Sequence, residues 1–387
     1  MSGRWSGRRG GAANRWLDRR TAPLGARRGG VDAIGWPAAP YLLVALALSL
    51  VTACAPATPG GGATAATSPT AGGATFHNPI QLGGHDPWVI QDGDYYYLSE
   101  SRADGSIWIT KSTAQNLTDM TAAGVATRVW SRPLSAAPNC ADVWAPELHR
   151  IGDRWVIYYA ATTCGGNNAL HRMFALESDT SDPMGTYHEA GQVTDSANRW
   201  AIDGTRFEFK GQAYFVWSGW AGETDGPQNL YIAAMSDPFT LVGQGVLISE
   251  PTYDWERRGA PINEGPEAIV TPDAVFLTYS ASASWGDDYC LGMLTGRGDD
   301  LLDPAAWTKT PTAVFSRTDD VFGPGHASFT RSPDGTQDWI VYHSARASGS
   351  GWDRVLNAQP FGWADAAPVF GTPVSPAQAL PVPSGQV

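Results

Sequence analysis

The chain has 387 residues, among them 17 Trp, 44 Gly and 28 Pro, and only 17% of its residues are charged. This length allows a large core, and the turn-rich, aromatic-rich composition favours an all-β domain over a helical one. The formal net charge is −12, although the first 53 residues carry eight Arg against two Asp. The rest of the chain is therefore strongly acidic and would repel a phosphate backbone, which argues against a nucleic-acid partner.

Residues 1–54 are predicted to direct export. The apolar run YLLVALALSLV at 41–51 is too short to span a bilayer and is typical of a signal-peptide core. It leads into Val51-Thr52-Ala53-Cys54, which resembles a bacterial lipobox, where the Cys is lipidated and becomes the first mature residue. An ordinary secretory cleavage near Ala55 is the alternative. We therefore expect an extracellular protein, either a cell-surface lipoprotein whose lipid anchor at Cys54 is its only link to the membrane, or a secreted one.

Residues 55–75 (APATPGGGATAATSPTAGGAT) form a segment of Gly, Ala, Thr and Pro with nothing to bury. Such a composition predicts a tether between the anchor and the folded body. The body is expected to occupy residues 76–387, with no room for a second domain.

The body contains five copies of one pattern, in which a polar motif opens a short strand that a tight turn joins to an aromatic strand. Successive motifs are separated by 58, 59, 61 and 62 residues, at Asp86, Trp144, Asp203, Glu264 and His326. Hairpins are expected, in chain order, over 86–99, 144–160, 201–219, 263–280 and 323–344, with closing strands near 361–363 and 369–371. A hairpin repeated about every sixty residues indicates radial repetition of a β-sheet unit. The sequence therefore predicts an all-β fold, a five-bladed β-propeller.

Three cysteines follow Cys54. Cys140 and Cys164 flank the second hairpin, and an odd count outside the cell indicates one disulfide and one free thiol. We expect Cys140 and Cys164 to pair, and Cys290, which lies in an apolar strand, to be free and buried.

The polar motifs are predicted to converge, because the first strand of each propeller blade lines the central axis. Asp86, Asp203 and Glu264 would then meet in one concave pocket. Three carboxylates fit hydrolysis of a glycosidic bond: one stays ionised to activate water, another keeps its proton for the leaving oxygen, and a third charge raises the pKa of that acid.

Five motifs and one late arginine follow one another along the body: DPW (86–88), WAPELH (144–149), IDGT (202–205), NEGP (263–266), GPGHASF (323–329) and Arg354. Together they resemble glycoside hydrolase family 43, over the whole body from about residue 76. Each motif alone is weak, whereas the ordered set is specific.

The resemblance implies an inverting mechanism. Asp86 would be the general base, Glu264 the general acid and Asp203 the residue that tunes the pKa of the acid, with base and acid roughly 6.5–9.5 Å apart. Arg354 would contact sugar hydroxyls. No cofactor would be required for the chemistry, but His326 matches a histidine that contacts a structural calcium or sodium ion in the central channel, or its water shell.

Each assignment has a structural alternative. Asp86 stands before a proline and could simply cap a turn. Glu267 competes with Glu264 for the acid, although the Gly that follows Glu264 would let the backbone approach a ligand closely. Glu147 is expected to hold neighbouring groups, and a lone histidine such as His326 is usually a satisfied core residue.

Two tryptophans next to the acidic motifs, Trp88 and Trp144, are predicted to line the pocket and bind sugar, although most of the 17 Trp must belong to the core. His85 departs from the family pattern, which usually has a small residue there, and it would narrow the sugar subsite.

The resemblance implies an exo-acting enzyme that releases terminal α-L-arabinofuranosyl residues from arabinan or arabinoxylan. The sugar follows from a subgroup that shares the YCLGMLT strand (289–295) and the segment from Arg354 to QPF (359–361). A β-xylosidase of the same family is the alternative enzyme, and a non-catalytic glycan-binding propeller lipoprotein is the alternative without chemistry. The expected partner is a plant cell-wall polysaccharide or oligosaccharide, and we expect a monomer.

Overall fold

The computed structural model describes residues 73–387. The predictions for the export segment, for Cys54 and for the tether up to residue 72 lie outside these residues. Within the described part, no helix is long and apolar enough to cross a membrane.

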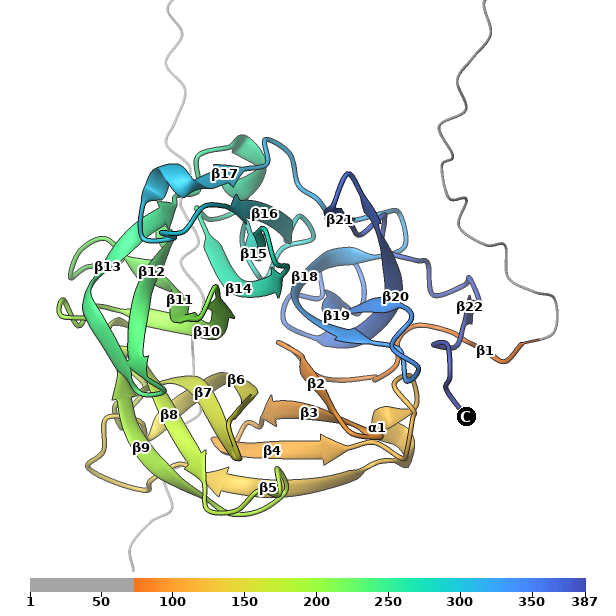
Figure 1. The fold of residues 1–387 in the computed structure, drawn as a ribbon, viewed down its shortest axis with the longest axis horizontal. Coiled ribbons are helices and arrows are strands. Elements are labelled where there is room, and N and C mark those ends of the chain that lie inside the picture. Colours follow the sequence, from red (N-terminus) through yellow and green to blue (C-terminus); the bar gives the residue numbers. More distant parts are fainter. Residues whose placement is uncertain (1–72) are drawn as a thin grey trace, which may run out of the picture. The chain divides into compact units, whose positions relative to one another are not determined.

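Five four-stranded antiparallel sheets surround one axis, and in each sheet the strands follow the chain from the axis outwards (Figure 1). The predicted five-bladed propeller and its five inner hairpins are therefore confirmed. From inside to outside, blade 1 consists of β2 (Trp88–Asp92), β3 (Tyr95–Ser101), β4 (Ser106–Lys111) and β5 (Val125–Ser131); blade 2 of β6 (Ala141–Ile151), β7 (Arg154–Thr162), β8 (Arg172–Ser178) and β9 (Tyr187–Val193); blade 3 of β10 (Ala201–Phe209), β11 (Gln212–Trp220), β12 (Gln228–Asp237) and β13 (Thr240–Ser249); blade 4 of β14 (Asn263–Val270), β15 (Val275–Ala281), β16 (Cys290–Gly296) and β17 (Trp307–Lys309); blade 5 of β18 (Phe322–Arg331), β19 (Asp338–Ala345), β20 (Arg354–Ala364) and β21 (Ala367–Val369).

The few remaining elements lie between or outside the blades: strands β1 (Thr75–Phe76) and β22 (Leu380–Pro381), the one-turn helix α1 (Met120–Ala123), and 3-10 turns at Asn168–Leu170, Asp254–Glu256 and Pro304–Ala306. The closing strand predicted near 369–371 is wrong by two residues, because β21 ends at Val369.

The N-terminal segment of the body pairs with the C-terminal strand and also contacts blade 5. Strand β1 pairs with β22, so the first described residues lie beside the last ones (Figure 1). The Asn78 side chain bonds to both the carbonyl and the N–H of Ala358 on β20, at 3.0 and 2.9 Å. Gln81 forms an isolated bridge with Leu356 on the same strand. The segment that enters blade 1 therefore closes the ring against blade 5.

The core lies between neighbouring blades, where aromatic and β-branched side chains of facing sheets interleave. One such cluster joins Phe207, Tyr214 and Val216 of blade 3 to Leu277 and Tyr279 of blade 4. Trp155 and Trp339 are among the largest fully buried side chains. Burial of this apolar surface is the main force that holds the blades together.

Each blade has a residue with left-handed backbone geometry within the first five residues of its inner strand or, in blade 1, two residues before it: φ is 49° at Asp86, 41° at Ala145, 53° at Asp203, 51° at Gly265 and 44° at His326. In blades 2 to 5 the strand pairing shifts register around this residue. A bulge of this kind bends the strand and redirects side chains, and such geometry is costly for residues other than Gly. When the five blades are aligned on these left-handed residues, Asp86, Asp203 and His326 keep the repeat positions that the sequence predicted. In blades 2 and 4 the equivalent residues are Ala145 and Gly265, each one residue after the predicted Trp144 and Glu264.

Adjacent blades are also joined by a recurring polar contact from the second strand of one blade to the inner motif of the next. Ser218 donates to the Asn263 carbonyl at 2.9 Å, and Ser280 accepts from the His326 N–H at 2.7 Å. In blade 5 the same place is taken by His343, whose Nδ1 accepts from the Asp86 N–H at 3.1 Å. This last contact completes the ring from blade 5 to blade 1.

Candidate active site

The predicted carboxylates lie at one end of the axis, because the inner strands all begin there. Antiparallel pairing brings the last residues of each second strand to the same end, as in the pairing of Ala201 with Gly219. The loops between second and third strands, such as 282–289 and 346–353, therefore surround this end. Asp86, Asp203 and Glu264 come from blades 1, 3 and 4.

Three histidines and one arginine surround the Asp86 carboxylate. Its Oδ1 lies 3.1 Å from His326 Nδ1 and 3.4 Å from both His343 Nδ1 and Arg354 Nη1, and its Oδ2 lies 3.1 Å from His85 Nδ1. Burial would raise the pKa of Asp86, but the charge of His326, its hydrogen bond and that of His85 hold it well below its usual value. This carboxylate is therefore ionised at neutral pH.

Asp203 is buried, and its Oδ2 accepts a hydrogen bond from the Gly265 N–H at 3.1 Å. This bond joins it to the residue after Glu264. Burial raises the pKa of Asp203 to about 6, and the charge of Asp86 adds to the rise against the opposing charge of His326.

Glu264 is also buried, and Tyr289 Oη donates to its Oε1 at 2.8 Å. Burial, followed by the charge of Asp203, raises the pKa of Glu264 to about 8. Asp86 and Glu264 thus have pKa values displaced in opposite directions, so that one is ionised and the other carries a proton at neutral pH.

Glycine is required directly after Glu264. Gly265 has a φ of 51°, and a Cβ at this position would lie 3.0 Å from the His326 ring. A larger residue would therefore be strained and would push His326 away from Asp86.

His326 lies among the site carboxylates. Its Nδ1 faces Asp86, and among residues 73–387 no three His, Cys, Asp or Glu side chains are grouped as metal ligands. Burial opposes protonation of His326, but the nearby carboxylates, with Asp86 foremost, raise its pKa to about 9. The metal role of His326 stays a prediction, and no step below depends on it.

Arg354 reaches the same group, as the sequence predicts. It is buried at the start of β20, donates to the Ser284 carbonyl at 2.6 Å, and lies 5.9 Å from the centre of the Tyr289 ring. These contacts fix the guanidinium beside Asp86. Its contact with sugar hydroxyls stays a prediction.

The two tryptophans that the sequence predicts to bind sugar, Trp88 and Trp144, differ in what their rings contact. Trp88 packs 4.4 Å from the His149 ring and donates its indole N–H to the Leu148 carbonyl at 2.7 Å, which favours a role in joining blades 1 and 2. Trp144 is partly exposed and stacks on His171 with ring centres 3.9 Å apart. Trp88 is partly exposed as well, but of the two only Trp144 lines the adjoining hollow described next.

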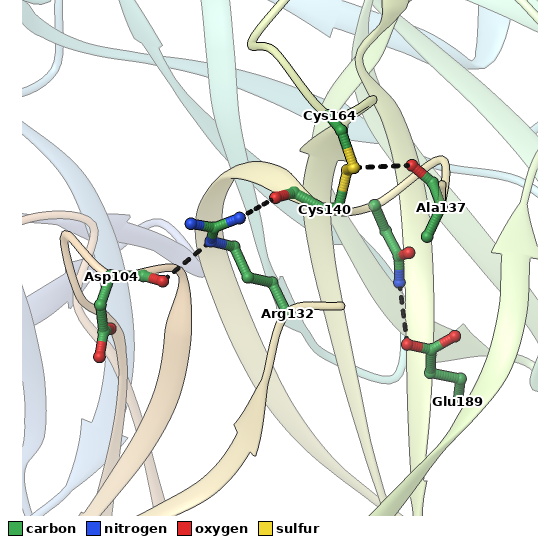
Figure 2. Close-up of a disulfide and its surroundings, with 7 residues drawn as sticks. Asp104, Arg132, Ala137, Cys140, Cys164 and Glu189 are labelled. Atoms are coloured by element: carbon green, nitrogen blue, oxygen red, sulfur yellow. Dashed lines mark hydrogen bonds between the residues drawn. A yellow bond between two sulfur atoms is a disulfide. The ribbon is translucent and has the colours of Figure 1, made fainter. Parts of the chain in front are cut away.

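A hollow with a volume of about 680 Å³ adjoins the site between blades 1 and 2, and its lining includes His85, Arg102, Asp142 and Trp144. The predicted disulfide between Cys140 and Cys164 is confirmed (Figure 2). Both cysteines line this hollow. Arg132 donates to the carbonyls of Asp104 and Cys140 and so connects the walls from the two blades (Figure 2). Within the described residues, Cys290 is free and buried, as expected.

Glu147 and Glu267 form a second acidic pair further along the inner strands. Glu147 lies 2.9 Å from His149 Nε2, and Thr205 Oγ1 donates to Glu267 at 3.3 Å. Burial raises the pKa of both carboxyls, and Glu267 raises that of Glu147 further. The structural role expected for Glu147 agrees with this network. Glu267 contacts Thr205 rather than the Tyr289 that supports Glu264.

Sequence reasoning missed two groups of the site, Tyr289 and His343. Tyr289 precedes β16 in a loop and carries no positional signal. His343 does, because the other four inner hairpins have Ser or Ala at this place: Ser101, Ala160, Ser218 and Ser280. A histidine in a position otherwise reserved for small residues is a signal that repeat alignment could have used.

Comparison with known proteins agrees with this geometry. The model of glycosyl hydrolases family 43 matches residues 76–368. An extracellular exo-α-(1→5)-L-arabinofuranosidase of Streptomyces avermitilis is 36% identical over 87% of this chain and 70% of its own, and one of Streptomyces chartreusis is 36% identical over 70% and 83%. The crystal structure of an α-L-arabinofuranosidase from Lactobacillus brevis superimposes with a TM-score of 0.73 at 35% identity, over 78% of this chain and 98% of that one. With the five-bladed fold and the carboxylates at one end of its axis, the chain belongs to glycoside hydrolase family 43.

Proposed function

We propose that this protein is an exo-acting α-L-arabinofuranosidase that releases terminal arabinofuranosyl residues from arabinan or arabinoxylan with inversion. The observation that carries the chemistry is the opposite displacement of the pKa values of Asp86 and Glu264 at one end of the axis. The sugar is supported by relatives named arabinofuranosidases at 33–36% identity.

Asp86 acts as the general base. Held ionised by its histidine and arginine neighbours, it takes a proton from a water molecule while the oxygen of that water attacks the anomeric carbon. Glu264 acts as the general acid and gives its proton to the glycosidic oxygen as the bond to the leaving chain breaks. Attack and departure on opposite faces of the sugar invert the anomeric configuration, and exchange with solvent restores both carboxyls.

Asp203 modulates the acid. Its charge makes ionisation of Glu264 less favourable, so the acid keeps its proton at neutral pH. Arg354, fixed between Asp86 and the Ser284 carbonyl, is available to bind sugar hydroxyls.

The test of the chemistry is Glu264→Ala. We expect this variant to lose turnover on substrates with poor leaving groups while sugar binding survives, because only proton donation is removed. Glu267→Gln is the matched control and should remain active. Unchanged activity of Glu264→Ala would move the acid to Glu267 or favour a non-catalytic glycan-binding propeller. A proton NMR time course on wild-type enzyme should show β-L-arabinose as the first product, and α-L-arabinose would exclude inversion.

The sugar is tested separately with aryl α-L-arabinofuranoside and aryl β-D-xyloside. Dominant cleavage of the xyloside would replace our assignment with β-xylosidase, since the two sugars present similar hydroxyls.

We also propose an export segment at 1–54, a tether at 55–75 and a catalytic domain at 76–387, with a lipid anchor at Cys54 and a monomeric enzyme. The extracellular location is supported by two relatives that are named extracellular. Cys54→Ala should release the protein from the cell surface, and size-exclusion chromatography with light scattering tests the monomer.

A further inference from the structure

Two exposed tryptophans lie side by side at the end of the axis that carries the carboxylates. Trp285 is 47% exposed and Trp352 is 65% exposed, and their ring centres are 5.7 Å apart at an interplanar angle of 66°. They belong to loops 282–289 and 346–353, which follow β15 and β19. Large aromatic side chains are rarely left open to solvent in pairs, and exposed apolar patches mark binding surfaces.

The two loops are held together by polar contacts rather than by burial of the rings. The Asp287 carboxylate accepts from the Gly349 N–H at 2.8 Å and from the Ser348 hydroxyl, and its carbonyl accepts from the Gly323 N–H at 2.8 Å. Trp352 Nε1 donates to Ser284 Oγ at 3.3 Å. The aromatic pair is therefore fixed before any ligand arrives, which reduces the entropy cost of binding.

The same loops reach the proposed catalytic groups directly. The Ser284 carbonyl accepts from Arg354, which contacts Asp86, and Tyr289 at the end of the first loop donates to Glu264. In the proposed mechanism Glu264 protonates the oxygen of the leaving chain, so that chain must pass on the side of Glu264. The loop that supports Glu264 through Tyr289 is the loop that carries Trp285.

We propose that Trp285 and Trp352 form a stacking platform for sugar rings of the leaving chain. Sugar rings present apolar C–H faces that pack on indole, whereas their hydroxyls remain in water. The proposal rests on the proposed glycosidase function and adds a preference: the enzyme favours oligomeric and polymeric arabinan over the shortest glycosides.

The test compares Trp285→Ala, Trp352→Ala and the double variant on arabinobiose and on arabinopentaose. For the wild-type enzyme, kcat/KM should rise from the dimer to the pentamer. The double variant should lose about tenfold on the pentamer, mostly through KM, with a much smaller change on the dimer. Trp285→Phe with Trp352→Phe should recover part of the loss. Trp363→Ala is the matched control, because Trp363 is 41% exposed near the opposite end of blade 5.

Affinity electrophoresis in debranched arabinan, with Glu264→Ala as the background, measures binding without turnover. Removal of both tryptophans should abolish the retardation that this background shows. Equal losses on dimer and pentamer, unchanged retardation, or an equal effect of Trp363→Ala would overturn the platform. A wild-type enzyme inactive on every arabinofuranoside would instead refute the proposed function, whatever the retardation shows.

Discussion

Tyr289→Phe is the sharpest test of how the proposed acid is tuned. The substitution removes one oxygen, which donates to Glu264 Oε1 at 2.8 Å, and leaves the ring that stacks on His343 with centres 5.6 Å apart. Burial and the charge of Glu264 raise the pKa of Tyr289 well above its usual value, so the phenol does not titrate in the working range. Any change in the pH profile therefore reports on Glu264.

The expected shift follows from the difference between two hydrogen bonds. A bond to a charged acceptor contributes about 1 kcal/mol more than a bond between neutral groups, and one pKa unit corresponds to about 1.4 kcal/mol. Tyr289 thus favours the ionised form of Glu264 by slightly less than one unit. Without it, the pKa of Glu264 should rise from about 8 to almost 9.

Because the acid must be protonated, activity is lost as pH rises through this pKa, and Tyr289→Phe should move the alkaline limb upwards. The assay is kcat/KM for an aryl arabinofuranoside between pH 5 and 10, which reports the free enzyme. Tyr342→Phe is the control, since its hydroxyl donates to Gln359 in the core of blade 5. An alkaline limb that stays in place, or moves downwards, would refute the assignment of Glu264 as the acid that Tyr289 tunes.

Three further predictions follow from the same contacts. Asp203→Asn removes the charge that raises the pKa of Glu264, while the side-chain oxygen of Asn can still accept from the Gly265 N–H. The alkaline limb of the pH–kcat/KM profile should therefore move down by about one to two pH units. An upward move in the same pH series would contradict this. His343→Ala leaves the partly buried N–H of Asp86 without its partner and removes a fully buried ring. It should lower the free energy of unfolding by about 2–4 kcal/mol, measured by urea denaturation. A loss below about 1 kcal/mol would mean that this contact does not hold the ring of blades closed. The Cys140–Cys164 disulfide joins residues 24 apart, so replacing both by Ala should cost up to about 3.5 kcal/mol by the chain-entropy relation, and an unchanged Tm would contradict it.

The repeat itself was available from the sequence. Five polar motifs about sixty residues apart predict five hairpins, since alternating short strands and tight turns are local signals. Cys140 and Cys164 flank one hairpin, so their pairing follows from the same local geometry. The closing strand β21 was predicted two residues too late, because no motif marks it.

What the sequence by itself determined, then, is the number of blades and the set of acidic residues that open the inner strands. Only the tertiary structure decided how those residues act. The pKa of Glu264 depends on Asp203 and Tyr289, and the charge on Asp86 depends on His326. These groups come from other blades or from a distant loop. Electrostatic interactions depend on distance in space, and the bulges at the strand starts set those distances through backbone angles that no local pattern encodes. The pairing of Trp285 with Trp352 has the same origin, because two side chains 67 residues apart in the sequence meet only when blades 4 and 5 pack together.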